Sequence, residues 1–201
     1  MELFKIRNSL WEDKKRERKA NSALISILGT VVFIALSLIL LFSTVFFSIQ
    51  VSGSSMNDTL VDKDFVVASR DLTPKKGDIV IIENVLSFWI IKRVVAVGGD
   101  IVRIYGGDLY INGEKMDEPY AKGKTFVNDI YNDFIFTVPD GEIFFLGDNR
   151  ENSTDSRYVD GHSTPLKNVV GVVMKWSIAT KDIRNFFYRI FAFPSSCRTG
   201  G

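Results

Sequence analysis

The sequence predicts a mainly β domain that follows one membrane-spanning helix. No charged side chain occurs between Ala20 and Asn57, and most of that run is Leu, Ile, Val and Phe. From about Val51 the texture changes, because short runs of Val, Ile and Phe alternate with clusters of Gly, Pro, Asp and Asn, as strands alternate with turns. A chain of 201 residues has room for one modest domain besides the helix.

Residues 1–22 form a basic head. Seven Lys and Arg side chains stand there against four Asp and Glu, a net charge of +3, whereas the whole chain carries +1 and the remainder therefore about −2. This balance gives no reason to expect a nucleic-acid partner. Because the basic residues precede the apolar run, the positive-inside tendency predicts a cytoplasmic N-terminus in the cell membrane and an extracytoplasmic domain.

The apolar run predicts a transmembrane anchor over residues 23–49. About 20 apolar residues cross roughly 30 Å of hydrocarbon, and this run is longer. A cleaved secretory signal has a shorter apolar core, about 7–15 residues, that ends in small residues, and no clear small-x-small site follows here. The length and uniform apolarity also argue against a buried helix of a soluble domain.

Residues 50–180 are predicted to form the extracytoplasmic β domain. The Asn112-Gly113 pair is a strong hairpin signal, because both positions of the turn accept a positive φ. A longer polar loop is expected from Met116 to Asp133. The strand candidates are 64–69, 78–83, 88–97, 100–105, 109–113, 134–138, 142–147 and 169–176.

Residues 181–201 differ again. Apolar side chains fall at helical spacing from Ile183 to Phe191, with Arg184 and Arg189 between them. This spacing predicts a short amphipathic helix that either lies on the membrane surface or packs on the β domain. The sequence leaves both alternatives open, and a disordered tail is expected to follow.

Cysteine and histidine counts exclude several kinds of site. Cys197 is the only cysteine, so the chain forms no internal disulfide and no thiolate cage. His162 is the only histidine, which excludes a zinc site built on several histidines, and we interpret it as a structural or surface residue. No metal or other cofactor is expected.

Three segments carry reactive or strongly polar side chains. They are Ser52–Leu60, just after the apolar run; Ile90–Val95, an apolar strand that contains Lys92; and Gly147–Arg157, which follows the apolar run at 143–146. Alone, each has an ordinary explanation as a linker, a strand with one exposed lysine, or a solvated loop. Together they offer a nucleophile, a base and groups that orient them.

Lys92 is the residue that gives this combination chemical meaning. Side chains alternate along a strand, so Ile90, Lys92 and Val94 share one face. Apolar neighbours remove water from the amine and disfavour its charged form. A neutral amine is a competent general base for a serine hydroxyl. The sequence alone does not show that Ser55 and Lys92 meet.

The three segments together resemble the bacterial type I signal peptidases, in particular the compact Gram-positive members. Ser55 to Leu60 matches their Ser-Met-x-Pro-Thr-Leu motif, Lys92 falls in their Lys-Arg-Val strand, and Gly147 to Arg157 matches their Gly-Asp-Asn-Arg-x-Asn-Ser-x-Asp-Ser-Arg box throughout. The Lys-Gly-Asp-Ile-Val segment at 76–80 matches a further strand. The resemblance covers about residues 20–176.

The resemblance implies roles for individual residues. Ser55 corresponds to the nucleophile and Lys92 to the general base. The serine that matches Ser153 hydrogen-bonds the base in the family, and Asp155 and Arg157 correspond to a structural ion pair near the site.

Two positions near the nucleophile depart from the common pattern. Asp58 stands where the family usually has the proline that shapes the turn after the nucleophile. Gly53 stands where some members have a serine that helps to bind the oxyanion, whereas others have glycine. The segment 158–166 matches only loosely.

The function implied is that of a membrane-bound serine endopeptidase that removes signal peptides from exported preproteins. Its partners are then the preprotein and the lipid bilayer. By the same resemblance the substrate lies extended between the strands before Ser55 and Lys92, and Val51, Leu60, Ile90 and Ile91 line shallow pockets for small side chains.

Two other classes of function are weighed against this one. A signal-peptidase-like accessory protein in export or pilus assembly binds without cutting; intact Ser55 and Lys92 argue against it, and Asp58 keeps it open. A self-cleaving repressor-type Ser–Lys protease is soluble and has a DNA-binding head, whereas this chain has an anchor.

Overall fold

The chain forms two compact units, Met1–Thr44 and Val45–Gly201, in the computed structural model. The structure describes residues 2–83, 88–127 and 133–179. The predicted C-terminal helix of residues 181–201 lies outside the described residues.

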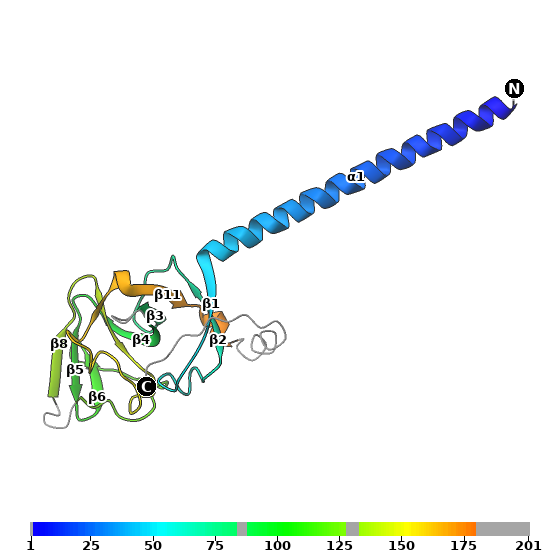
Figure 1. Cartoon of the computed structure of the whole chain (residues 1–201). Helices are drawn as coiled ribbons and strands as arrows, with labels where there is room; N and C mark the ends of the chain where they lie inside the picture. The colour runs from blue at the N-terminus through cyan, green and yellow to red at the C-terminus, as the bar shows by residue number, and fades with distance from the viewer. Residues whose placement is uncertain (1, 84–87, 128–132, 180–201) are drawn as a thin grey trace. The chain divides into compact units, whose positions relative to one another are not determined.

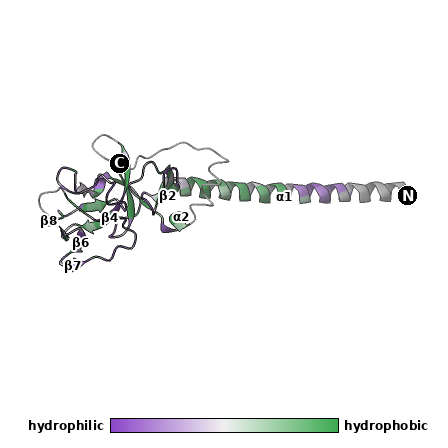
Figure 2. Cartoon of the chain, turned by 90° about the horizontal axis from the view of Figure 1, so that it is seen from below, coloured by the Kyte–Doolittle hydropathy of each residue, from purple (hydrophilic) through white to green (hydrophobic). Residues whose placement is uncertain are grey.

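The first unit is a single helix. Helix α1 spans Glu2–Val45, and its part from Lys14 is long and apolar enough to cross a membrane, judged by length and composition. Large apolar side chains are exposed from Leu24 to Phe42, and Figure 2 shows this stretch of α1 mainly in the hydrophobic colour, after a hydrophilic stretch nearer the N-terminus. A helix that is apolar all round calls for an apolar environment.

The predicted span extends four residues too far. Strand β1 covers Phe46–Gln50, so the last four residues assigned to the anchor from the sequence lie in a sheet. Phe47 and Ile49 of this strand pack into an apolar core of the second unit. Uniform apolarity hides the change from helix to strand in the sequence.

The second unit contains two antiparallel sheets (Figure 1). The seven-stranded sheet has the order β1-β2-β11-β3-β4-β9-β10, and the four-stranded sheet has the order β7-β6-β5-β8. The bounds after β1 are β2 Phe65–Ser69, β3 Ile79–Glu83, β4 Trp89–Val97, β5 Ile101–Tyr105, β6 Asp108–Ile111, β7 Glu114–Lys115, β8 Asp133–Thr137, β9 Glu142–Leu146, β10 Thr164–Pro165 and β11 Val169–Val173. A 3₁₀ turn, Leu166–Asn168, precedes β11, and helix α2, Lys175–Ala179, follows it.

The centre of the large sheet is buried on both faces. On β3, Ile79 and Ile81 belong to one apolar cluster, whereas Val80 and Ile82 belong to another. Strand β4 pairs with β3 in register Val80↔Lys92, so Lys92 starts from the middle of this doubly covered region. Lys92 is therefore buried, whereas a lysine in a strand usually faces solvent.

All eight strands predicted from the sequence are confirmed. The Asn112-Gly113 hairpin is confirmed as well, with φ of 54° and 87°, and it joins β6 to β7. The prediction missed β1, β7 and β10, and it extended β11 through Trp176, which belongs to α2. Two-residue strands such as β7 and β10 are too short to show alternation.

The turn between β4 and β5 depends on Asp100. Its carboxylate accepts hydrogen bonds from the Val97 N–H at 2.9 Å, from Asn112 Nδ2 at 2.8 Å and from Lys76 Nζ at 3.1 Å. Burial alone would raise the pKa of Asp100, but these bonds outweigh it and hold the pKa below its ordinary value of 3.8. The charged carboxylate therefore ties two turns and a lysine together.

We expect Asp100→Asn to lower the free energy of unfolding by about 1–2 kcal/mol at pH 7, because the ionised acceptor is lost. Because the pKa of Asp100 is lower in the folded state, its contribution is present above the unfolded pKa and disappears as the pH falls through the folded pKa. Urea unfolding at pH 7 and at about pH 2 measures this. An equal difference between wild type and variant at both pH values would contradict the assignment.

Candidate active site

Ser55 and Lys92 lie next to each other inside the second unit. Lys92 Nζ is 2.7 Å from Ser55 Oγ, within hydrogen-bonding distance, although 37 residues separate them in the sequence. Both side chains are fully buried. The structure thus brings together the two residues that the sequence singled out as nucleophile and base.

Strand β4 fixes the position of the lysine. Lys92 lies opposite Val80 of β3, and the apolar side chains of Ile82, Ile90 and Val94 flank it on the same face of the sheet. Burial removes water from the amine, and the loss of hydration disfavours the ammonium form. The sheet therefore holds the amine in surroundings that suit a base.

The loop that carries Ser55 is fixed by hydrogen bonds on both sides. Gly53, at φ 98°, donates its N–H to Asp62 Oδ1 at 2.9 Å, and this left-handed conformation favours glycine. After the serine, the N–H of Asn57 donates to the carbonyl of Ser54 at 3.0 Å, and the N–H of Leu60 donates to that of Met56 at 2.9 Å. The loop therefore has one defined conformation around the hydroxyl.

The 147–157 segment holds this loop from the other side. The N–H of Asn149 donates to the carbonyl of Ser55 at 3.0 Å, and Asn149 Nδ2 donates to the carbonyl of Ser54 at 3.1 Å. Asn152 Nδ2 donates to Ser54 Oγ at 2.7 Å. These bonds leave the backbone N–H of Ser55 unused among the described residues.

Gly147 permits this close approach. A Cβ at this position would lie 2.6 Å from the carbonyl oxygen of Ser55 and would also overlap the side chain of Ser153. The absence of a side chain at 147 therefore lets the 147–157 segment pack closely against the loop that carries Ser55.

A buried ion pair connects β4 to the loop that carries Ser55. Arg93, the residue after Lys92, donates to both carboxylate oxygens of Asp148, from Nε at 2.7 Å and from Nη2 at 2.6 Å. Thr59 Oγ1 donates to the same carboxylate at 2.6 Å. The guanidinium also stacks on Tyr120, 3.9 Å from the ring centroid. Asp148 therefore connects all three sequence segments.

Two further buried ion pairs support the box. Arg157 binds both oxygens of Asp155, whose Oδ2 also accepts from the N–H of Gly147 at 2.9 Å. Arg150 binds both oxygens of Glu118 and donates to the carbonyl of Gly147 at 3.0 Å. One residue of each pair thus hydrogen-bonds the backbone of Gly147, which packs against Ser55.

The expected hydrogen bond between Ser153 and Lys92 is not present. Ser153 Oγ is buried and has no hydrogen-bond partner in the described part of the chain. The hydroxyl lies instead against Gly147. The structure therefore confirms the Asp155–Arg157 ion pair and corrects the contact expected for Ser153.

The four residues expected to line substrate pockets belong to two apolar clusters. Val51, Leu60 and Ile91 are buried together in one cluster, whereas Ile90 is half-buried and packs on the other. The three buried side chains share their cluster with Met56, the residue after Ser55. Their role in binding stays a prediction.

Several site residues escaped the sequence analysis. Arg93, Asp148 and Thr59 lay inside the quoted motifs but received no role, and Glu118 lay in a loop that shows little pattern. One feature of the sequence could have indicated Asp148: charged residues are dense directly after the apolar run 143–146, and charges next to a core are buried only when they are paired. Pairing between distant segments cannot be read from spacing.

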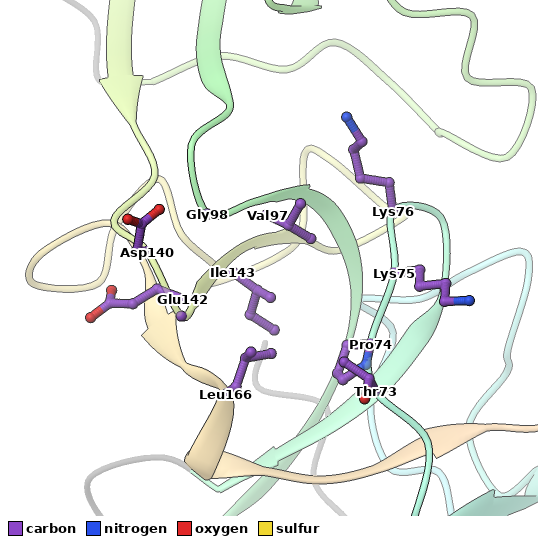
Figure 3. Close-up of a pocket in the computed structure, with 11 residues that line it drawn as sticks. Thr73, Pro74, Lys75, Lys76, Val97, Gly98, Asp140, Glu142, Ile143 and Leu166 are labelled. Atoms are coloured by element: carbon purple, nitrogen blue, oxygen red, sulfur yellow. The ribbon is translucent and has the colours of Figure 1, made fainter.

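A separate cavity of about 410 Å³ lies at the other end of β4 and β9. Figure 3 shows Val97, Ile143 and Leu166 around its interior, with the charged ends of Lys75, Lys76, Asp140 and Glu142 directed away from it. No polar groups converge there, and neither Ser55 nor Lys92 lines it. The described residues also hold no group of three or more His, Cys, Asp or Glu suited to a metal ion.

Comparison with known proteins finds one family. The model of the family "Signal peptidase, peptidase S26" matches residues 24–177. Signal peptidase I of Bacillus amyloliquefaciens is 31% identical over 156 residues, which cover 73% of this chain and 84% of that protein. Signal peptidase I U of Bacillus subtilis is 33% identical over 154 residues, which cover 71% of this chain and 80% of that protein. A solved signal peptidase I from Enterococcus faecalis matches at 32% identity with a TM-score of 0.43, covering 51% of this chain and 98% of that one.

We expect Gly147→Ala to lower the free energy of unfolding by about 1–3 kcal/mol, because its Cβ overlaps the Ser55 carbonyl and the Ser153 side chain. Removing the second obstacle in the double variant Gly147→Ala/Ser153→Gly should recover only part of the loss, since the Ser55 carbonyl is backbone. Thermal unfolding of the two single variants and the double variant measures this. Full recovery in the double variant would show that Ser153 alone forbids a side chain at 147.

Proposed function

The chain belongs to the signal peptidase family, peptidase S26, and from that premise we propose that it removes signal peptides from exported preproteins with Ser55 as nucleophile and Lys92 as general base. The observation that carries the proposal is the 2.7 Å separation between Ser55 Oγ and Lys92 Nζ in a fully buried setting. A serine becomes a nucleophile when an adjacent base takes its proton.

The mechanism proceeds through an acyl-enzyme. The neutral amine of Lys92 accepts the hydroxyl proton of Ser55 as Oγ attacks the carbonyl carbon of the scissile bond. The resulting ammonium donates that proton to the leaving amine. The amine of Lys92 then takes a proton from water as the water attacks the ester carbonyl, and it returns that proton to Ser55 Oγ as the signal peptide is released.

The backbone N–H of Ser55 is the donor that we assign to the developing oxyanion. It belongs to the nucleophile itself, and among the described residues it makes no competing hydrogen bond. Gly53 has no side-chain hydroxyl to add a donor, so the oxyanion depends on backbone groups at this position. A fixed donor aimed at developing charge is an effective source of rate enhancement.

The substrate is a preprotein with small residues before the cut. We assign Val51, Leu60 and Ile91, which belong to the apolar cluster that also contains Met56, to the subsites for these small residues. Helix α1 anchors the enzyme in the membrane in which the apolar segment of the substrate also resides. The basic head supports an N-terminus in the cytoplasm and a catalytic unit outside it.

We expect Ser55→Ala and Lys92→Met each to abolish cleavage of a preprotein with an Ala-x-Ala site, with a loss of about 10³-fold or more in kcat/KM. Methionine keeps the length and apolarity of the lysine stem, so the folded unit should survive while the base is lost. Intact-mass analysis of the full chain in detergent locates the cut and measures the rate.

Lys76→Met is the matched control, since it removes an exposed lysine whose partner is Asp100, away from Ser55. It should cleave at the wild-type rate. A Lys92→Met protein that is folded and still cleaves would exclude Lys92 as the base. A folded wild type that cuts no preprotein would favour the accessory-protein alternative.

A further inference from the structure

A cavity of about 350 Å³ opens on the face of the sheet from which Lys92 projects. Its apolar lining comes from Ile82 on β3, Ile90 on β4, Phe145 on β9 and Val159. This cavity is distinct from the buried apolar cluster that contains Val51 and Leu60.

The apolar residues that line the cavity are neighbours of Lys92 in the sheet, although Lys92 itself does not line it. Ile90 and Lys92 are two residues apart on one strand and so share a face, about 7 Å from one another. Ile82 lies opposite Ile90 in the β3–β4 pairing, and Phe145 lies opposite Val94 in the β4–β9 pairing. The apolar lining therefore flanks the stem of Lys92 on both neighbouring strands.

The chemistry of the reaction determines which part of the substrate reaches this side. Lys92 must protonate the amine that leaves, so the residue after the cut passes the Lys92 amine. An extended chain advances about 3.3 Å per residue, so the second or third residue after the cut reaches Ile90 and the cavity.

Two carboxylates stand at this cavity. Glu83 at the end of β3 and Asp160 both line it, and both residues are exposed. In the described part of the chain neither carboxylate has an ion-pair or hydrogen-bond partner. An apolar cavity with unpaired acids suits a long side chain that has an apolar stem and a positive end, as in Lys and Arg.

The segment that supplies Val159 and Asp160 is held in place by the catalytic box. The N–H groups of Tyr158 and Val159 donate to the carbonyl of Asp155 at 2.8 and 3.2 Å, and Asp155 is the buried partner of Arg157. His162 Nδ1–H donates to the carbonyl of Ser156 at 2.8 Å, and the His162 ring packs on Phe134 at 4.9 Å between centroids. This wall of the cavity is thus a built surface connected to the site.

We propose that this cavity is a subsite for the mature part of the preprotein, and that Glu83 and Asp160 give it a preference for Lys or Arg at the second or third residue after the cut. The inference rests on the proposed function and adds to it a selection on the far side of the cleaved bond. Both acids act on binding of the substrate, not on the chemistry at Ser55.

The test uses full-length protein in detergent and three preproteins that differ only at the second and third residues after the cut. These residues are Lys-Lys, Gln-Gln or Glu-Glu, and the signal peptide with its Ala-x-Ala site is constant. We expect kcat/KM to be about two- to tenfold higher for Lys-Lys than for Gln-Gln, the range that two partly exposed ion pairs supply, and lowest for Glu-Glu. Raising the salt concentration should reduce the difference.

The double variant Glu83→Gln/Asp160→Asn should lose the preference and cleave the Lys-Lys and Gln-Gln preproteins with about equal kcat/KM. Glu114→Gln/Asp117→Asn is the matched control, because it removes two exposed carboxylates that do not line the cavity. This control should keep the preference. Together the two double variants separate a local effect from a change in net charge.

The possible failures are distinguishable. Equal cleavage of the three preproteins by the wild type, or a preference that survives in Glu83→Gln/Asp160→Asn, overturns the subsite while the proposed function stands. No cleavage of any preprotein, Gln-Gln included, overturns the proposed function and the subsite together. A preference for Glu-Glu overturns the sign of the charge selection.

Discussion

The burial of a lysine amine in the middle of a β-sheet is the constraint on which the rest of the site depends. Removing such a group from water costs several kcal/mol when it is charged, and burial thereby favours the neutral form that the proposed mechanism requires. The large sheet can hold Lys92 in this state because apolar clusters cover β3 and β4 on both faces. The same apolar burial that stabilises this sheet therefore also provides the surroundings that the proposed base requires.

Once the amine is buried, the serine must be brought to it with little freedom, and three buried ion pairs do this. Arg93–Asp148, Arg150–Glu118 and Arg157–Asp155 all attach to the segment that follows β9. Buried pairs are weak evidence for net stability, because desolvation offsets much of their attraction. Their geometric effect is clearer: each fixes the backbone near Gly147, in the segment whose Asn149 N–H binds the Ser55 carbonyl.

The sequence predicted local structure better than it predicted contacts. Strands such as β2 and β9 show their pattern within a few residues, so they could be located, whereas β10 is two residues long and exists only through its pairing with β9. The Ser55–Lys92 contact followed from family resemblance, since no local pattern reports a distance across 37 residues. Glu118 was missed for the same reason, because its partner Arg150 lies 32 residues away.

The same view explains why the nucleophile loop does not require a proline at position 58. Proline would stiffen the turn by restricting its own backbone. Here the loop is already fixed by Asp62 at Gly53, by Asn149 at the Ser54 and Ser55 carbonyls, and by Asp148 at Thr59. The Asp58 side chain is 81% exposed and pairs with Lys122 at 3.3 Å, so its charge stays in water. The constraint that a proline would impose within the loop is imposed here by Asp62 and by the 147–157 segment, whose Asp148 also binds Arg93 beside Lys92.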